Sequence, residues 1–160
     1  RIEREPVLIQ RMVDRAADRH VRGFPDRRIR VEHDDSLPPI FGSPVYVEQI
    51  LANLLSNAEK YSPTEVPIEI AVTIVGGQAN VSVCDRGVGI APEELETVFT
   101  AFYRSPRTAA QQGFGIGLAV CKRLVEAQDG RVWASPRDGG GTCFTFSLPV
   151  ASDDAGVAEA

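Results

Sequence analysis

Hydrophobic positions recur every three or four residues in three segments of the chain, which is the spacing of an amphipathic helix. The first segment is 6–22, where arginine and aspartate fill the other positions and Gly23 ends the pattern. The other two are 44–61 and 117–128. Pro92 is followed by two glutamates and favours a further short helix, because proline and carboxylates suit a first turn.

Elsewhere apolar and polar residues alternate, which is the period of a half-buried strand. Two pairs of such segments flank glycine-rich turns, at Gly76-Gly77 and at 139–141, and each pair is typical of an antiparallel hairpin. Two shorter strands are expected before the second helix. In chain order, the predicted strands are 29–31, 39–42, 66–75, 80–85, 131–134 and 142–148.

The order of these elements predicts an α+β fold, a two-layer α/β sandwich in which helices cover one face of a mixed, mostly antiparallel sheet. Residues 99–116 have no periodicity and are rich in Ser, Pro, Thr, Gln and Gly. A loop of this length in a compact domain is usually functional, as a lid is. We expect a single domain over 1–150 and a small, acidic, disordered tail over 151–160.

Composition narrows the class of protein. The 160 residues fit one domain, and 43% hydrophobic with 24% charged residues excludes a disordered chain, a collagen-like fibre and a disulfide-stapled miniprotein. The net charge of -5 leaves no broad basic field. Nucleic acid is therefore not an expected partner, and any polyanion must be held by specific groups.

The cysteines Cys84, Cys121 and Cys143 lie far apart, without metal-binding spacing. They predict reduced, buried thiols in a cytoplasmic domain rather than a disulfide framework or a zinc site. No apolar run approaches the ~20 residues of a membrane span and no signal peptide opens the chain, so no direct membrane contact is expected. Because the chain starts at Arg1 without an initiator methionine, we expect a fragment of a longer protein, whose own membrane anchoring stays open.

Helix 44–61 carries a polar stripe as well as its apolar one: Asn53, Asn57, Lys60 and Tyr61 share one face. Asparagine is a poor interior helix residue, because its amide competes for backbone hydrogen bonds. The stripe is either a solvated face or the wall of a polar pocket. In a pocket, amide oxygens suit Mg²⁺ arriving with phosphates, and lysine meets a phosphate as a point charge.

The strand at 80–85 delivers Asp85 to its end, and Gly87 and Gly89 let the following backbone turn tightly. This pattern is often only a turn. A carboxylate at the edge of an apolar pocket also accepts a hydrogen bond from an exocyclic amine such as that of adenine. Thr142, at the start of the last strand, is either an ordinary β-former or a hydroxyl that joins the same site.

The loop 99–116 begins with aromatic residues that are predicted to anchor its base, and it continues with Arg104 and Arg107. A loop arginine is usually solvated, but one on a lid can close over a γ-phosphate and offset its charge. The glycines that follow lead into a helix, the geometry in which backbone N–H groups and a helix N-terminus hold phosphate. They are Gly113, Gly115 and Gly117.

In their order and spacing, these segments resemble the catalytic and ATP-binding domain of bacterial sensor histidine kinases, within the GHKL superfamily of gyrase, chaperone, histidine kinase and mismatch-repair ATPases. The likeness runs from about residue 7 to 149. NLLSNAEKYSP is similar to the family's N box, DRGVGI to its first glycine box, FYR to its F box and GFGIGLAV to its second glycine box. The resemblance implies the Bergerat fold, a mobile ATP lid, and ATP with Mg²⁺ as cofactors.

The resemblance also implies roles for single residues on the phosphate side. Asn57 is expected to ligate Mg²⁺, with Asn53 nearby to organise the metal and the phosphates. Lys60 is expected to contact phosphate, and Arg104 to approach the γ-phosphate. Asn53, Lys60 and Arg104 are therefore the implied catalytic residues.

On the base side, the resemblance places Tyr61 near the adenine and Asp85 on its amine, with Thr142 in support. The other implied ligand-binding residues belong to the two glycine boxes: Gly87, Gly89, Ile90, Gly113, Phe114, Gly115, Ile116, Gly117 and Leu118. Phe114 departs from the family pattern of Thr or Ser, so a hydroxyl contact to phosphate is lost. Ser43 stands where many relatives have Asp, and we expect it to cap the helix 44–61.

Kinases of this family phosphorylate a histidine on a separate, dimeric helical domain. Neither His20 nor His33 is expected to be that acceptor. The resemblance therefore implies the ATP-binding half of a two-component kinase, a monomer in isolation, that works with a dimerisation domain and, through it, a response regulator.

Two other kinds of function remain to be weighed. A gyrase- or chaperone-like ATPase and a serine kinase of the anti-sigma type are both disfavoured, because those relatives carry a catalytic glutamate where this chain has Asn53. An amide cannot act as the base. A module that senses ATP without catalysis is the other alternative, and Phe114 is the one motif change that favours it.

Overall fold

The computed structural model describes residues 2–100 and 117–152 of the chain. Its helices are α1 (Ile9–Gly23), α2 (Pro44–Tyr61) and α3 (Gly117–Glu126), with the short 3-10 helices η1 (Pro92–Glu94) and η2 (Thr97–Phe99). Its strands are β1 (Glu5–Val7), β2 (Ile29–Glu32), β3 (Ile40–Gly42), β4 (Ile68–Val75), β5 (Gln78–Cys84), β6 (Arg131–Pro136) and β7 (Thr142–Pro149). None of the helices in the two described segments is long and apolar enough to cross a membrane.

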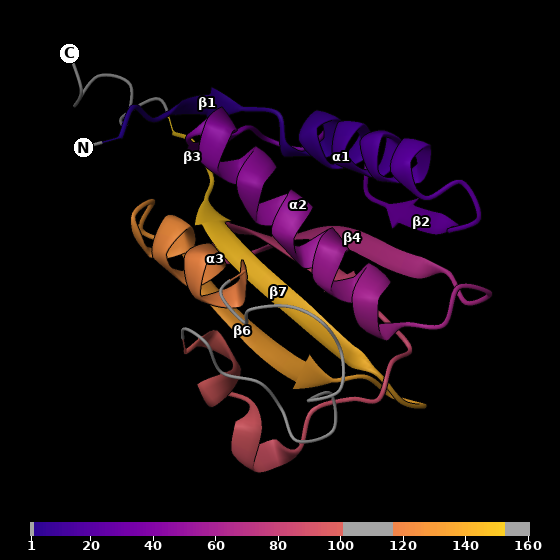
Figure 1. The fold of residues 1–160 in the computed structure, drawn as a ribbon. Coiled ribbons are helices and arrows are strands. Elements are labelled where there is room, and N and C mark those ends of the chain that lie inside the picture. Colours follow the sequence, from indigo (N-terminus) through magenta and orange to yellow (C-terminus); the bar gives the residue numbers. More distant parts are fainter. Residues whose placement is uncertain (1, 101–116, 153–160) are drawn as a thin grey trace.

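The elements form two layers, with the α-helices on one face of a five-stranded sheet (Figure 1). The strand order is β2-β4-β5-β7-β6, in which β2 runs parallel to β4 and the other pairings are antiparallel. A separate ladder joins β1 to β3. The predicted mixed, mostly antiparallel sheet under a helical layer is confirmed.

The predicted turns and helix cap have the expected local geometry. Gly76 and Gly77 join β4 to β5 with φ angles of 54° and 79°, the left-handed values that favour a two-residue hairpin turn. α2 begins after Ser43, whose Oγ accepts a hydrogen bond from the N–H of Tyr46 at 3.3 Å. Serine therefore caps this helix as expected.

Several predicted boundaries differ from the structure. The first helix starts at Ile9 rather than at residue 6, because residues 5–7 pair with β3 as a strand. α3 ends at Glu126, two residues early. Phe99 was expected to open the lid loop but ends η2 and is buried, while residues 101–116 and 153–160 lie outside the described residues.

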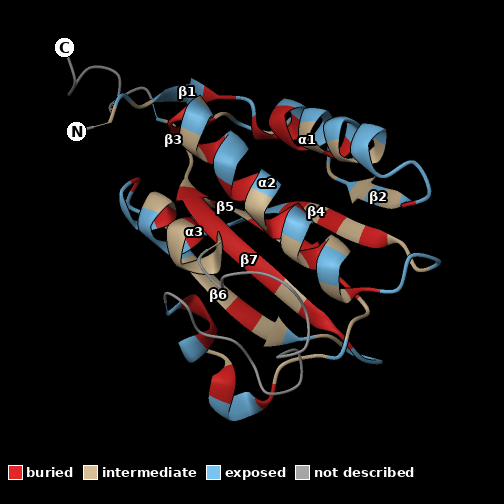
Figure 2. Cartoon of the chain, in the orientation of Figure 1, coloured by how far each residue is buried: buried red, intermediate tan, exposed pale blue. Residues whose placement is uncertain are grey.

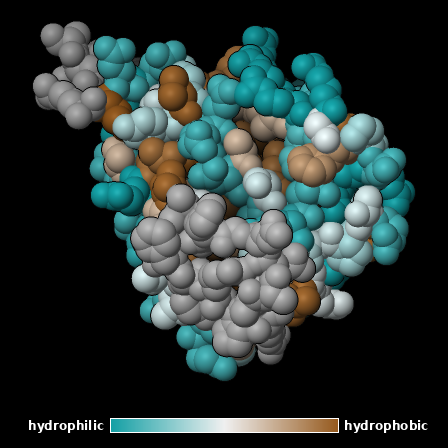
Figure 3. Space-filling model, viewed as in Figure 1, coloured by the Kyte–Doolittle hydropathy of each residue, from teal (hydrophilic) through white to brown (hydrophobic). Residues whose placement is uncertain are grey.

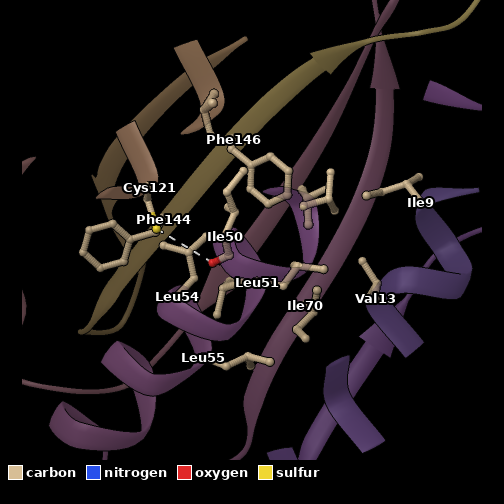
Figure 4. Close-up of a cluster of buried hydrophobic side chains, with 14 of the residues drawn as sticks. Ile9, Val13, Ile50, Leu51, Leu54, Leu55, Ile70, Cys121, Phe144 and Phe146 are labelled. Carbon is tan, nitrogen blue, oxygen red and sulfur yellow. Dashed lines mark hydrogen bonds between the residues drawn. The ribbon is translucent and has the colours of Figure 1, made fainter. Parts of the chain in front are cut away.

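The core lies between the helices and the sheet, and its largest helical contribution comes from α2. Ile50, Leu51 and Leu54 are each 0% exposed, and Figure 4 shows them among Val13 of α1 and Phe146 of β7. Burying each such side chain stabilises the fold by roughly 1.5–3 kcal/mol. The outer faces of the helices are exposed (Figure 2), and the surface over α1 is mainly hydrophilic (Figure 3). This packing fixes α2, and with it the polar stripe on its other side.

The cysteine prediction is wrong for two of the three residues. Cys84 and Cys143 are direct partners in the β5–β7 pairing, their Cα atoms lie 4.1 Å apart, and they form a disulfide. They are 59 positions apart in sequence, and only the pairing of these two strands brings them together. Cys121 is a free, buried thiol as predicted, and burial raises its pKa to about 12.

Candidate functional site

The site is built around a buried carboxylate. Asp85 follows the end of β5 and is 3% exposed. Its Oδ1 accepts hydrogen bonds from the N–H of Gly87 at 2.8 Å and from the N–H of Thr142 at 3.3 Å. Burial raises the pKa of this carboxyl, and the two backbone hydrogen bonds offset that rise only in part. Both of these hydrogen bonds reach Oδ1, and none joins Oδ2 to another of the described residues.

Glycines let the backbone close around this carboxylate. A Cβ at Gly87 would lie 2.5 Å from the carbonyl oxygen of Tyr61, so glycine is needed for the loop to rest against the end of α2. A Cβ at Gly141 would lie 2.1 Å from the carbonyl oxygen of Asp85. Gly89 has a φ of 77°, which also favours glycine. The tight turn predicted after β5 is confirmed.

The polar stripe of α2 is not a uniformly solvated face. The Nδ2 of Asn53 donates to the carbonyl oxygen of Gly117 at 3.3 Å, and its Oδ1 accepts from Gln49 at 2.8 Å. Asn53 therefore ties α2 to the first residue of α3. Asn57 is half-buried, and its side chain makes no hydrogen bond within the described residues. The Nζ of the exposed Lys60 lies 5.6 Å from the centre of the half-buried Tyr61 ring.

The last turn of α2 lies beside the loop that holds the carboxylate. Ser62 follows the helix, is buried, and accepts a hydrogen bond at Oγ from the N–H of Arg86 at 3.2 Å. The same loop touches the end of the helix through Gly87. These contacts bring together four of the predicted site residues, Tyr61, Asp85, Gly87 and Thr142, while Asn57 and Lys60 lie near the C-terminal end of the same helix α2.

Other predicted site residues have different surroundings. Ile90 and Leu118 are partly buried and pack against the hydrophobic core. Gly117 begins α3 next to Asn53. The remaining predicted residues lie outside the described residues: Arg104, Gly113, Phe114, Gly115 and Ile116.

Two arginines that the sequence did not single out support the carboxylate loop. The Nη1 of Arg137 donates to the carbonyl oxygen of Asp85 at 3.2 Å, and its Nη2 pairs with Glu69. The Nη1 of Arg86 donates to the carbonyl oxygen of Gly140 at 2.9 Å, in the turn before β7. In the sequence, only their position beside glycine-rich turns indicates this supporting role. That indication is weak, because arginine is mostly a surface residue.

The donor set does not form a metal cage. Within the described ranges, no group of three or more His, Cys, Asp or Glu side chains is placed to hold a metal ion. A single amide oxygen, such as that of Asn57, still fits Mg²⁺, which keeps several waters and usually binds together with phosphates.

The sequence matches a known family and curated relatives. Residues 42–152 match the family described as histidine kinase-, DNA gyrase B- and HSP90-like ATPase. The adaptive-response sensory kinase SasA of Parasynechococcus marenigrum (strain WH8102) is 40% identical over 124 residues, which cover 76% of this chain and 32% of that protein. This chain spans about a third of the length of the curated relatives that it matches.

Solved structures agree as well. The mycobacterial sensor histidine kinase MprB has 28% identity and a TM-score of 0.78, covering 92% of this chain and 97% of that chain. Full-length ShkA, solved in complex with AMPPNP, has 27% identity and a TM-score of 0.81, covering 95% of this chain and 32% of that chain. The expected sandwich of this superfamily, the Bergerat fold, is confirmed. The chain belongs to the histidine kinase-, DNA gyrase B- and HSP90-like ATPase family, on its sensor histidine kinase branch.

Proposed function

We propose that the chain binds Mg-ATP and transfers the γ-phosphate to a histidine on a separate dimerisation domain, as the ATP-binding half of a two-component kinase. The observation that carries this proposal is the buried Asp85 carboxylate, with one oxygen held by backbone N–H groups and the other without a hydrogen bond in the described residues. An acceptor of this kind suits the exocyclic amine of adenine and disfavours the carbonyl that guanine has there.

The groups at the end of α2 are suited to the phosphate side. The half-buried amide of Asn57 would give Mg²⁺ one oxygen ligand, while phosphates and water supply the others. When bound, Mg²⁺ would neutralise part of the phosphate charge. The ammonium of Lys60 is exposed and can meet a phosphate directly. We propose that Arg104 and the second glycine box, which lie outside the described residues, complete this side.

Phosphotransfer is favoured over hydrolysis by the state of Asn53. Its amide cannot take a proton from water, and both of its ends are already engaged, with Gln49 and with Gly117. The chain's work is then to position ATP and offset its charge, while an imidazole attacks the γ-phosphorus.

The acceptor is proposed to lie on another domain, because neither histidine of this chain is well placed. The side chain of His20 is 9% exposed, and its Nε2 lies 2.8 Å from Glu59. The His33 Nε2 lies 2.9 Å from Asp14, and this hydrogen bond raises the pKa of the imidazole. A response regulator would then receive the phosphate from the dimerisation domain.

The deciding experiment is labelling with γ-³²P-ATP. The 160-residue chain is incubated alone and with the dimerisation domain of its full-length kinase, and acid-labile protein label and released phosphate are measured. We expect label on the added domain and none on the chain. Self-labelling of the chain, or rapid phosphate release without transfer, would contradict the proposal, and ATP binding without either product would favour an ATP-sensing module.

The metal ligand is tested separately with Asn57→Ala. AMPPNP binding is measured by calorimetry with Mg²⁺ and with EDTA. We expect the variant to lose most of the Mg²⁺-dependent gain in affinity, about tenfold or more. Ser56→Ala, at an exposed position of the same helix, is the matched control and should behave as the wild type. An unchanged Mg²⁺ dependence in Asn57→Ala would remove it from the metal site.

A further inference from the structure

Arg27 lies in the turn between α1 and β2, and its side chain is 0% exposed. The phosphotransfer described above does not use it, yet each of its five N–H groups has an acceptor. Nε and Nη2 donate to the two carboxylate oxygens of Glu59 at 2.9 and 3.1 Å. The other donors reach the carbonyl oxygens of Ser62 at 2.8 Å, Pro63 at 2.6 Å and Val66 at 2.7 Å.

These acceptors surround the end of α2 that carries the phosphate-side groups. Glu59 lies between Asn57 and Lys60 in the sequence, and Ser62 is the C-cap residue that follows the helix. The Ser62 hydroxyl in turn accepts the N–H of Arg86, the residue after the buried carboxylate. One guanidinium therefore holds the last turn of α2 and, through a single serine, the loop on the base side.

Stability alone is a poor reason to bury this group. Taking a guanidinium and a carboxylate out of water costs several kcal/mol per ion, and replacing such a pair by apolar side chains is often neutral or stabilising. Arginine differs from other cations because its planar fork fixes the directions of five hydrogen bonds at once. Lysine has three donors and cannot satisfy the same set. The fork is suited to holding several backbone groups in one arrangement.

We propose that Arg27 is a positioning residue of the nucleotide site. It does not touch the ligand; it holds the last turn of α2 and the Asp85 loop in the arrangement that binds Mg-ATP. Groups that are ordered beforehand bind more tightly, because the cost of ordering them does not fall on the binding step. This inference rests on the proposed function, since it concerns the same site.

The test compares Arg27→Lys, which keeps the charge and loses the fork, with the wild type. Affinity for AMPPNP with Mg²⁺ is measured by calorimetry well below the Tm of both proteins. We expect binding about tenfold weaker or more, because small displacements of positioning groups are costly. In the full-length kinase, the KM for ATP should rise while the maximal transfer rate changes less.

Val13→Ala is the matched control, because it destabilises the core at α1, away from the end of α2. If Arg27 were merely structural, the two variants would show the same affinity at a comparable loss of Tm. We expect Val13→Ala to bind AMPPNP as the wild type does. Equal affinity in wild type and Arg27→Lys would overturn the inference, whereas failure of the wild type itself to bind would overturn the proposed function.

Ser62→Ala keeps the inference testable if Arg27→Lys does not fold. This change removes only the hydroxyl that accepts the Arg86 N–H, while the Ser62 carbonyl stays available to Arg27. We expect AMPPNP binding several-fold weaker, with a Tm within a few degrees of the wild type. Unchanged affinity in a folded Ser62→Ala protein would show that the link from Arg27 to the base side does not position it, and would overturn the proposal.

Discussion

Burying the carboxylate of Asp85 costs free energy of folding, and ligand binding would explain why the group is buried. Burial raises its pKa above the ordinary value of 3.8, despite hydrogen bonds from Gly87 and Thr142. A group whose pKa is raised on folding contributes stability below its ordinary pKa and loses it as the pH rises through the raised one. The ionised form of Asp85 therefore lowers the stability of the domain without nucleotide.

Asp85→Asn should separate binding from stability. The amide oxygen can still accept the two backbone N–H groups, but its NH₂ offers the adenine amine a donor instead of an acceptor. We expect AMPPNP binding at least about tenfold weaker by calorimetry. The Tm at neutral pH should equal or exceed that of the wild type. The control is Asp138→Asn, which removes the same charge at an exposed position. Near-normal AMPPNP affinity in Asp85→Asn would contradict the proposed contact between Asp85 and adenine.

Among the secondary-structure elements, α1 and α2 are joined through Glu59. Burial alone would raise the pKa of Glu59, but hydrogen bonds from Arg27 and His20 outweigh it and the pKa is lowered. A group whose pKa is lowered on folding contributes stability above its ordinary value, here 4.5, and loses it as the pH falls through the lowered one. Acid should therefore loosen this junction.

Glu59→Gln should show that loss already at neutral pH. We expect the free energy of unfolding to fall by roughly 3 kcal/mol, because Arg27 keeps its buried charge without its partner. Below pH 4.5 the difference from the wild type should shrink. Urea unfolding over a pH series measures both effects. Glu48→Gln, which breaks an exposed pair with Arg19, should cost at most about 1 kcal/mol, and a cost as small for Glu59→Gln would contradict the prediction.

The disulfide joins β5 to β7 at the positions next to Asp85 and Thr142. Reduction should lower the free energy of unfolding by about 2–4 kcal/mol, because it releases a long closed loop in the unfolded chain. Urea unfolding with and without dithiothreitol measures this. A double variant, Cys84→Ala with Cys143→Ala, should be insensitive to the reductant. An unchanged urea midpoint on reduction would contradict the structural role of the disulfide. Cys121 is buried and has a pKa of about 12, so it should resist alkylation until the chain unfolds.

For the molecule as a whole, local patterns could be predicted from the sequence and non-local pairings could not. The periodicity of 44–61 sufficed for the bounds of α2, and the alternation around Gly76 predicted a hairpin. Nothing in a local window shows that β5 lies beside β7, so the cysteine pair was missed. Arg27 was missed for a similar reason, because most of its acceptors are backbone carbonyls, which leave no mark in the sequence.

The same difference between local patterns and non-local pairings separates the site residues that were predicted from those that were missed. Asn57 was predicted because asparagine is unusual inside a helix, whereas Asp85 and Thr142 were predicted because each stands at one end of a strand beside a glycine-rich segment. Arg137 supports Asp85 from another hairpin, and its position near the carboxylate depends on how β4, β5 and β7 pair. Motifs therefore predicted the groups that would meet the ligand, while the groups that hold them required the fold.

Binding of the proposed nucleotide should stabilise the whole domain, because a ligand that binds only the folded state shifts the unfolding equilibrium by mass action. At a concentration about 100 times Kd, Mg-AMPPNP should add about 2.7 kcal/mol. For a chain of this size that corresponds to a rise in Tm of roughly 5–10 °C. The net charge of -5 supplies no general attraction for a polyanion, so the rise should depend on the base. GMPPNP has a carbonyl where AMPPNP has the amine whose hydrogen bond Asp85 would accept. GMPPNP should therefore raise the Tm little or not at all. Asp85→Asn should lose the shift with AMPPNP. Equal shifts with both nucleotides would show that the phosphates alone are recognised and that the buried carboxylate serves another purpose.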